Sequence, residues 1–244
     1  MRRMVKPALA LSGLLTVATA CAGVGSVERQ LTTPETQTSP TPGATTAVFP
    51  YSSEPIAIEP GTYRISKSEW ALRDFTVAFP DGWTVQYGHV YAKHPDAADE
   101  IGFYAVVVDA IFADACRGGE VSVEVGPSVD DLAQALIQHS GPVASASVQT
   151  TLGGHPATRV DFAVPDGFDV QACRMQGAGL QIWYSPPADK HFVLLPDGRA
   201  SAYIVDVDGQ RQVFLSQHRS ATSDEQVAEL QAILDSIVID TSPQ

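Results

Sequence analysis

The segment that most constrains the fold lies between residues 22 and 58, because its composition leaves little to bury. It is rich in Thr, Pro, Ser, Gly and Ala, and no large apolar residue follows Leu31 before Thr46. Such a segment cannot gain enough from burial to offset its loss of conformational entropy on ordering. We therefore expect a flexible tether over residues 21–58. The folded unit is then restricted to residues 59–244, the size of one ordinary domain.

The first 20 residues have the layout of a targeting signal. Three basic residues precede an apolar run over residues 7–17, and small residues lead into Cys21. This run is shorter than the roughly 20 residues needed to span a bilayer, and no later uncharged segment reaches that length. The pattern resembles a bacterial lipoprotein signal, with Ala18 where the commonest form has Leu.

This resemblance implies that residues 1–20 are a cleaved signal peptide and that Cys21 carries the lipid. A diacylglyceryl thioether with an N-acyl chain would anchor the protein on the extracytoplasmic face of the cell membrane. Ordinary secretion, with Cys21 incidental, and a retained anchor both stay open as alternatives.

The charge of the chain is strongly negative. It has 15 basic and 28 acidic residues, a formal net charge of −13 at pH 7. Removal of the three basic residues ahead of Cys21 shifts this to about −16, and such a protein is repelled by polyphosphate and anionic headgroups. We therefore expect no nucleic-acid partner.

Two further cysteines, Cys116 and Cys173, lie inside the expected domain. An even pair in an extracytoplasmic domain is most simply interpreted as a disulfide. Neither cysteine belongs to a CxxC motif or has a histidine close to it in the sequence. Two free thiols, a metal pair and a catalytic thiol remain as weaker alternatives.

Alternating apolar residues and turn signals predict several strands. Residues 74–79 alternate before a Pro-Asp-Gly turn, and residues 101–112 form the near-continuous apolar run typical of a central buried strand. A Gly-Gly turn lies within a predicted pair of strands over residues 150–164. Residues 202–207 and 212–216 flank Asp208-Gly209, a strong hairpin signal. A further strand is expected at residues 180–184.

Two segments have the spacing of amphipathic helices. Residues 128–139 place apolar side chains on one face behind Ser128, an expected N-cap, and residues 223–236 do the same behind Ser223. Two helices and roughly seven strands predict an α+β fold, a mostly antiparallel sheet flanked by two helices and preceded by the disordered tether.

The order of these parts resembles the PsbP-like α/β/α sandwich, which also occurs in secreted lipoproteins of actinobacteria. The resemblance covers about residues 74–239 and rests on the strand that ends in Phe79-Pro-Asp-Gly-Trp83, Gly154-His155-Pro156-Ala157 at the start of a strand, and the terminal helix. The scarcity of lysine also resembles the usage of a GC-rich actinobacterium. The family hosts unrelated roles, so the resemblance implies a fold and no reaction.

A search for chemistry assigns no catalytic, cofactor-binding or metal-ligating residue. The chain lacks GxSxG, HExxH, Walker and helix-opening GxGxxG motifs, and its six histidines are scattered. Asp206-Val-Asp208-Gly209 resembles half of a calcium loop but fits a tight hairpin better, because the bidentate acid of that loop is missing. Tyr63 and Lys67 have the spacing of an oxidoreductase pair, without the dinucleotide-binding fold that pair requires.

The aromatic residues are the remaining indication of a ligand-binding site. The three tryptophans, with two tyrosines, could line a concave apolar pocket or could simply form the core; they are Trp70, Trp83, Trp183, Tyr63 and Tyr184. We expect a non-enzymatic binding or accessory module that holds an envelope protein or a small ligand near the membrane. The alternative is a secreted cell-envelope hydrolase with a dispersed active site. A sensory ectodomain is disfavoured.

Overall fold

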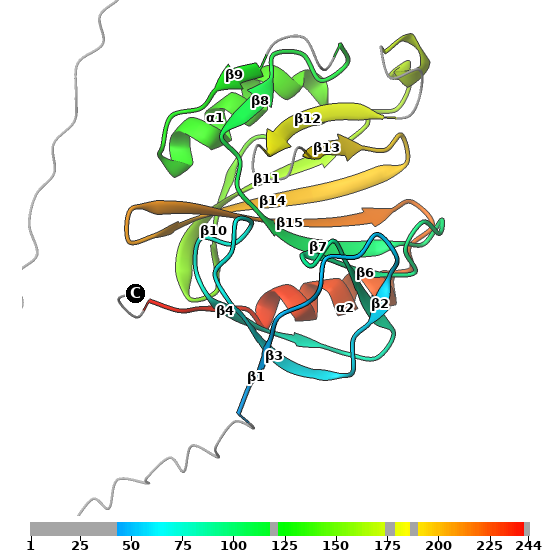
Figure 1. The fold of residues 1–244 in the computed structure, drawn as a ribbon. Coiled ribbons are helices and arrows are strands. Elements are labelled where there is room, and N and C mark those ends of the chain that lie inside the picture. Colours follow the sequence, from blue (N-terminus) through cyan, green and yellow to red (C-terminus); the bar gives the residue numbers. More distant parts are fainter. Residues whose placement is uncertain (1–42, 118–121, 174–178, 186–189, 242–244) are drawn as a thin grey trace, which may run out of the picture. The chain divides into compact units, whose positions relative to one another are not determined.

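An eight-stranded antiparallel sheet organises the folded part of the chain (Figure 1). The computed structural model describes residues 43–117, 122–173, 179–185 and 190–241. In order of pairing, the strands of this central sheet are β10 (Val148–Leu152), β11 (His155–Ala163), β14 (Gly198–Val207), β15 (Gln210–Arg219), β7 (Ile101–Val106), β6 (Val90–Lys93), β5 (Trp83–Gln86) and β2 (Ile56–Ala57). The predicted Gly-Gly and Asp-Gly hairpins are confirmed, since they join β10 to β11 and β14 to β15.

Two four-stranded sheets accompany the central sheet. The lower sheet in Figure 1 contains β1 (Thr45–Ala47), β3 (Gly61–Ile65), β4 (Phe75–Phe79) and β16 (Val238–Ile239). The upper sheet contains β13 (Lys190–Leu194), β12 (Leu180–Ser185), β8 (Ala110–Phe112) and β9 (Ser122–Glu124). Only β1 and β3 pair in parallel among the described strands. The sequence predicts an antiparallel α+β domain correctly, but it predicts about seven strands where the described residues form sixteen.

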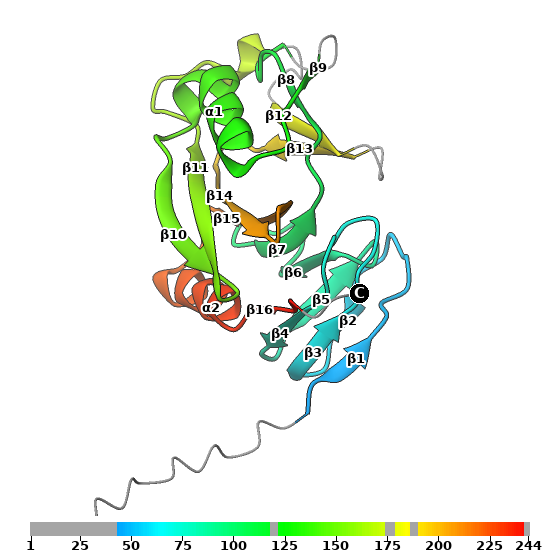
Figure 2. The ribbon, with the colours of Figure 1, turned by 90° about the vertical axis from the view of Figure 1, so that its left-hand side faces the viewer.

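Both predicted helices are confirmed, with their caps. Helix α1 (Val129–Ser140) follows Ser128, whose hydroxyl accepts the backbone N–H of Asp131. Helix α2 (Asp224–Asp235) follows Ser223, which caps Gln226 in the same way. Each cap satisfies N–H groups that have no partner within the helix. Two short 3₁₀ turns are η1 (Gly141–Val143) and η2 (Val170–Ala172). Figure 2 shows α1 beside β11 and β8, and α2 on the other side of the central sheet, beside β4 and β16.

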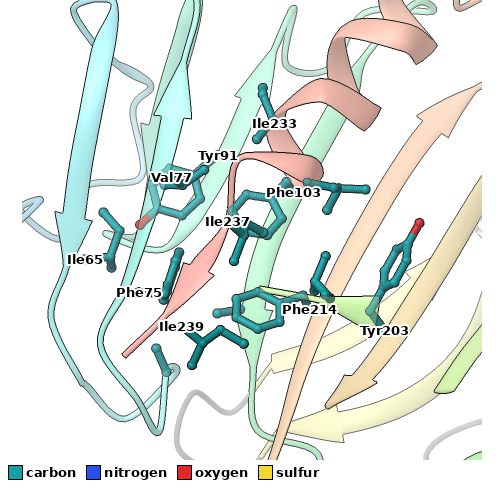
Figure 3. Packing of buried hydrophobic residues seen from close by; sticks show 14 of the residues in the cluster. Ile65, Phe75, Val77, Tyr91, Phe103, Tyr203, Phe214, Ile233, Ile237 and Ile239 are labelled. Atoms are coloured by element: carbon teal, nitrogen blue, oxygen red, sulfur yellow. The ribbon is translucent and has the colours of Figure 1, made fainter. Parts of the chain in front are cut away.

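The central sheet separates two hydrophobic cores because its side chains alternate between its faces. On β15, Phe214 points into the first core, with α2 and the lower sheet, whereas Val213 and Leu215 point into the second, with α1 and the upper sheet. In the first core Phe75 meets Phe214 edge-on, with ring centroids 5.2 Å apart. Figure 3 shows Ile237 and Ile239 beside these rings, and Ile233 of α2 on the side of Phe103.

The folded part begins earlier than residue 59, so the expected boundary of the tether is wrong for residues 43–58. Strand β1 pairs with β3, β2 pairs with β5, and the compact unit extends from Pro40. Phe49 and Ile56 pack against the first core. Composition could not show this. A segment with only a few apolar residues can still be ordered when it pairs with the edge of a sheet. The rest of the expected tether, Cys21 and residues 1–20 lie outside the described residues.

The apolar run over residues 101–112 is not one strand. It divides into β7 of the central sheet and β8 of the upper sheet, with a crossing between them. Side chains satisfy carbonyls of this crossing: Ser185 donates to Val107 at 2.7 Å, and the guanidinium of Arg211 donates to Val108. Both strands are largely buried, so the sequence is apolar on either side of the crossing. The exposed Asp109 is the one charged residue of the run and lies in the crossing, but it does not show which sheet the next strand joins.

Candidate functional site

The predicted disulfide is confirmed, because Cys116 is bonded to Cys173. The sulfur atoms therefore take no part in metal binding or thiol catalysis. Within the described residues, no group of three or more histidine, cysteine, aspartate or glutamate side chains could hold a metal ion. Asp206 accepts the N–H of Gly209 at 2.7 Å, which is the tight hairpin expected at this sequence. Neither described helix has the length and apolar character needed to cross a bilayer.

The cavity with the most aromatic lining lies where the upper sheet faces the central sheet. Its volume is about 170 Å³. Its lining side chains come from the loop before β4, the β5–β6 turn, and strands β6, β7, β12, β13 and β15. They are Trp70, Tyr87, His89, Val90, Tyr104, Val106, Trp183, Ser185, Phe192 and Gln217. We call this the aromatic cavity; none of these side chains is an aspartate, glutamate, lysine or arginine.

One wall of the aromatic cavity is a stack of Trp70 on His89. The two rings are 3.5 Å apart between centroids and inclined by only 9°. Ser68 holds Trp70 in place, since its hydroxyl accepts the backbone N–H of Trp70 at 3.2 Å. Nδ1 of His89 lies 2.8 Å from the carbonyl oxygen of Tyr87. Because a carbonyl can only accept, Nδ1 carries the proton in this contact.

The β5–β6 turn can present His89 because its backbone enters the left-handed region. Tyr87 has φ 52° and Gly88 has φ 73°. A Cβ on Gly88 would lie 3.0 Å from the carbonyl oxygen of Phe49, so the turn and the N-terminal segment approach closely there. The segment also fixes the turn directly, since the N–H of Tyr87 donates to the carbonyl of Ser52 at 2.7 Å. The misassigned part of the tether therefore supports one wall of the cavity.

A second part of the lining is aromatic and deeply buried. Trp183 and Phe192 are 1% and 6% exposed, and their ring centroids are 4.5 Å apart. Strands β12 and β13 are antiparallel neighbours, which brings these two residues into register. In Figure 2 these strands lie above β6 and β7.

A short polar chain begins in the cavity. The hydroxyl of Tyr104 donates to Oε1 of Gln217 at 3.0 Å, and Nε2 of Gln217 donates to Oε1 of Glu100 at 3.3 Å. Burial, with a smaller contribution from the Glu100 carboxylate, raises the pKa of Tyr104 well above its usual range. Burial also raises the pKa of Glu100 above its usual value. Tyr104 therefore remains a neutral hydroxyl group at physiological pH.

A second, more open groove of about 440 Å³ lies at the carboxyl ends of β11 and β15 and the start of β14. Here Ser201 donates to the carboxylate of Asp161 at 2.6 Å, and His218 also lines the groove. A hydrolase would need a serine coupled to a base and a buried acid. Asp161 instead has a side chain that is 39% exposed, and it pairs with Arg159. No hydrogen bond joins Ser201 to His218 among the described contacts.

The sequence identified only part of the aromatic cavity. Trp70 and Trp183 line it as the pocket hypothesis requires. Trp83 instead belongs to the first core, where its indole N–H donates to Glu229 at 2.8 Å. Tyr63 packs against the same core, and Tyr184 is not among the lining residues. The other lining residues have no signal in the sequence, because five strands and two loops contribute them.

Comparison with known proteins gives little guidance. No protein-family model matches the chain, and no curated protein matches it. Among solved structures, the solution structure of cyanobacterial PsbP (CyanoP) from Synechocystis sp. PCC 6803 is similar at 8% identity. The alignment covers 75% of this chain and 94% of that chain, with a TM-score of 0.32.

Proposed function

We propose that this chain is a lipid-anchored binding protein of the bacterial cell envelope, and that its folded domain holds a small ligand in the aromatic cavity. The observation that carries the proposal is a cavity of about 170 Å³ lined mainly by buried aromatic rings. An engineered cavity of about 150 Å³ with apolar walls binds benzene, so a volume of this order takes one ring. A mainly apolar pocket with a few polar groups is the usual form of a small-molecule site.

The lining supports binding better than catalysis. It offers rings, three hydroxyl groups, one amide and one imidazole, and it contains no aspartate, glutamate, lysine or arginine side chain. The alternative, a cell-envelope hydrolase, would have to use the open groove at Ser201. That groove lacks the serine–base contact and the buried acid that would activate a nucleophile.

The binding test uses fluorobenzene as the probe and follows its ¹⁹F signal on titration with the purified chain. We expect saturable binding that is lost in Val90→Phe, because Val90 lines the cavity and a larger side chain fills it. Val148→Phe is the matched control, since Val148 lies on the exposed edge strand β10 and is absent from the lining. Absence of saturable binding, or equal binding by the Val90→Phe variant, would contradict the proposal.

The anchor is a separate part of the proposal and rests on the sequence around Cys21. In its bacterial host, Cys21→Ser should release the protein from the membrane fraction, and mass spectrometry should find a diacylglyceryl group on the wild-type N-terminal cysteine. A thermal unfolding transition at an unchanged temperature would show that the released variant is folded. A Cys21→Ser protein that stays with the membrane would contradict lipidation at this residue.

We also propose that the domain is PsbP-like and that the chain is a secreted actinobacterial lipoprotein. The support is the sequence order of a strand with a Pro-Asp-Gly-Trp turn, a mid-chain helix, a late hairpin and a terminal helix. The structure has these elements as β4, α1, the β14–β15 hairpin and α2. An experimental structure whose strand order differs from that of PsbP proteins would contradict the assignment.

A further inference from the structure

The aromatic cavity selects against charge. None of its lining side chains is an aspartate, glutamate, lysine or arginine, and the chain as a whole is strongly acidic. An ion that enters an apolar site loses its hydration, and this cost is recovered only where a countercharge or several hydrogen bonds replace the water. The occupant is therefore neutral.

The walls favour a flat occupant of one ring. The stacked rings of Trp70 and His89 form one part of the lining. The rings of Trp183 and Phe192 form a second aromatic part. Aromatic rings interact best with other rings in offset-stacked or edge-on contacts. A volume of about 170 Å³ holds a ring with one small substituent and leaves no room for a long chain.

The polar groups of the cavity determine which substituent fits. Tyr104 gives its only hydroxyl proton to Gln217, and Ser185 gives its own to the carbonyl of Val107 at 2.7 Å. The Gln217 amide is oriented by Glu100, which accepts its N–H, so the amide oxygen faces Tyr104. The hydroxyl oxygens of Tyr104 and Ser185 then have only lone pairs to offer. A substituent that donates a hydrogen bond satisfies them, and one that only accepts does not.

We propose that the aromatic cavity binds a neutral, single-ring aromatic molecule that carries a hydrogen-bond donor, an O–H or N–H group, which donates to the hydroxyl oxygens of Tyr104 and Ser185. This inference rests on the proposed function and narrows its ligand class. A phenol is the simplest member of the class.

Four fluorinated probes of one ring test the inference: fluorobenzene, 4-fluorophenol, 4-fluoroanisole and 4-fluorobenzoate, each titrated by ¹⁹F NMR at pH 7. A net hydrogen bond predicts that 4-fluorophenol binds about two- to tenfold more tightly than fluorobenzene. The methyl ether cannot donate, so 4-fluoroanisole should bind no more tightly than fluorobenzene. The charged benzoate should bind most weakly. Equal affinities for the phenol and the ether would overturn the inference.

Substitutions test which hydroxyl oxygens cause the preference for 4-fluorophenol. Tyr104→Phe with Ser185→Ala removes these two hydroxyl oxygens and should reduce the affinity of 4-fluorophenol to that of fluorobenzene measured in the same variant. Tyr91→Phe is the control, because its buried hydroxyl lies in the first core and outside the cavity. A phenol preference that survives the double substitution would contradict the assigned acceptors. If the double variant does not fold, Tyr104→Phe alone should reduce the preference.

The outcomes separate this inference from the proposed function. Binding of fluorobenzene without a preference for the phenol would contradict the inference that the ligand donates a hydrogen bond. It would still support the proposal that the cavity binds small rings. No binding of any probe defeats both.

Discussion

Breaking the bridge between Cys116 and Cys173 should destabilise the domain by an amount that the structure fixes. The bond spans a sequence separation of 57 residues and closes a loop that contains β9, α1, β10 and β11. For a loop of this length the chain-entropy estimate is about 4 kcal/mol at 25 °C. In a domain of about 200 residues, 1 kcal/mol corresponds to roughly 2–4 °C in Tm, so reduction should lower Tm by about 8–16 °C.

Two measurements separate the cross-link from local packing. Reduction of the wild-type protein leaves both sulfur atoms in place, whereas Cys116→Ala with Cys173→Ala also removes the sulfur of Cys173, which is only 3% exposed. The variant should therefore be slightly less stable than the reduced wild type, and its Tm should not respond to reductant. Urea unfolding followed by circular dichroism gives the free energies. A loss of less than about 1 kcal/mol on reduction would refute the loop-entropy reasoning.

Two further perturbations have a clear direction. The Asp74 carboxylate accepts the N–H of Lys67 at 2.7 Å and pairs with Arg64 at 2.9 Å, and these contacts hold its pKa below the ordinary 3.8. The contribution of the Asp74 carboxylate to folding stability is therefore complete above pH 3.8. It is lost as the pH falls through the lower pKa that this carboxyl group has in the folded protein. The Tm difference between the wild type and Asp74→Asn should be constant from pH 5 to 7 and shrink below about pH 4; a difference that persists unchanged to pH 2 would contradict the account. Gly153→Ala should lower Tm more than Gly154→Ala: both glycines have positive φ, but a Cβ on Gly153 would lie 2.5 Å from Ile239 Cγ1, while one on Gly154 meets nothing within 4 Å. Equal shifts in Tm would show that Ile239 moves aside.

Local signals allowed much of the secondary structure to be predicted. Ser128 and Ser223 each accept a hydrogen bond from a backbone N–H three residues later. The Asp208-Gly209 turn is closed by a hydrogen bond between Gly209 and Asp206. These features depend on few neighbours, so the sequence contains all the information they need.

Features that depend on distant contacts could not be predicted in this way. The change of sheet between β7 and β8 is marked by one charged residue, Asp109, which does not show which strand β8 pairs with. The packing of Phe49 on Tyr91 needs a partner 42 positions along the chain. The aromatic cavity illustrates the same limit. Trp70 and Trp183 were candidates because tryptophan is rare in this chain, whereas Gln217 and Ser185 have no distinguishing pattern in the sequence.

The shared central sheet has a consequence for how the domain opens. Strand β15 contributes Phe214 to the first core and Val213 and Leu215 to the second. If one core unfolds and β15 moves, the other core therefore loses packing as well. Partial unfolding that spares one half is therefore costly, and a single cooperative transition is expected. Hydrogen exchange should show it: amides of β14 and β15 should exchange only through global opening, while those of β1 and β2 at the sheet edges exchange through local fluctuations.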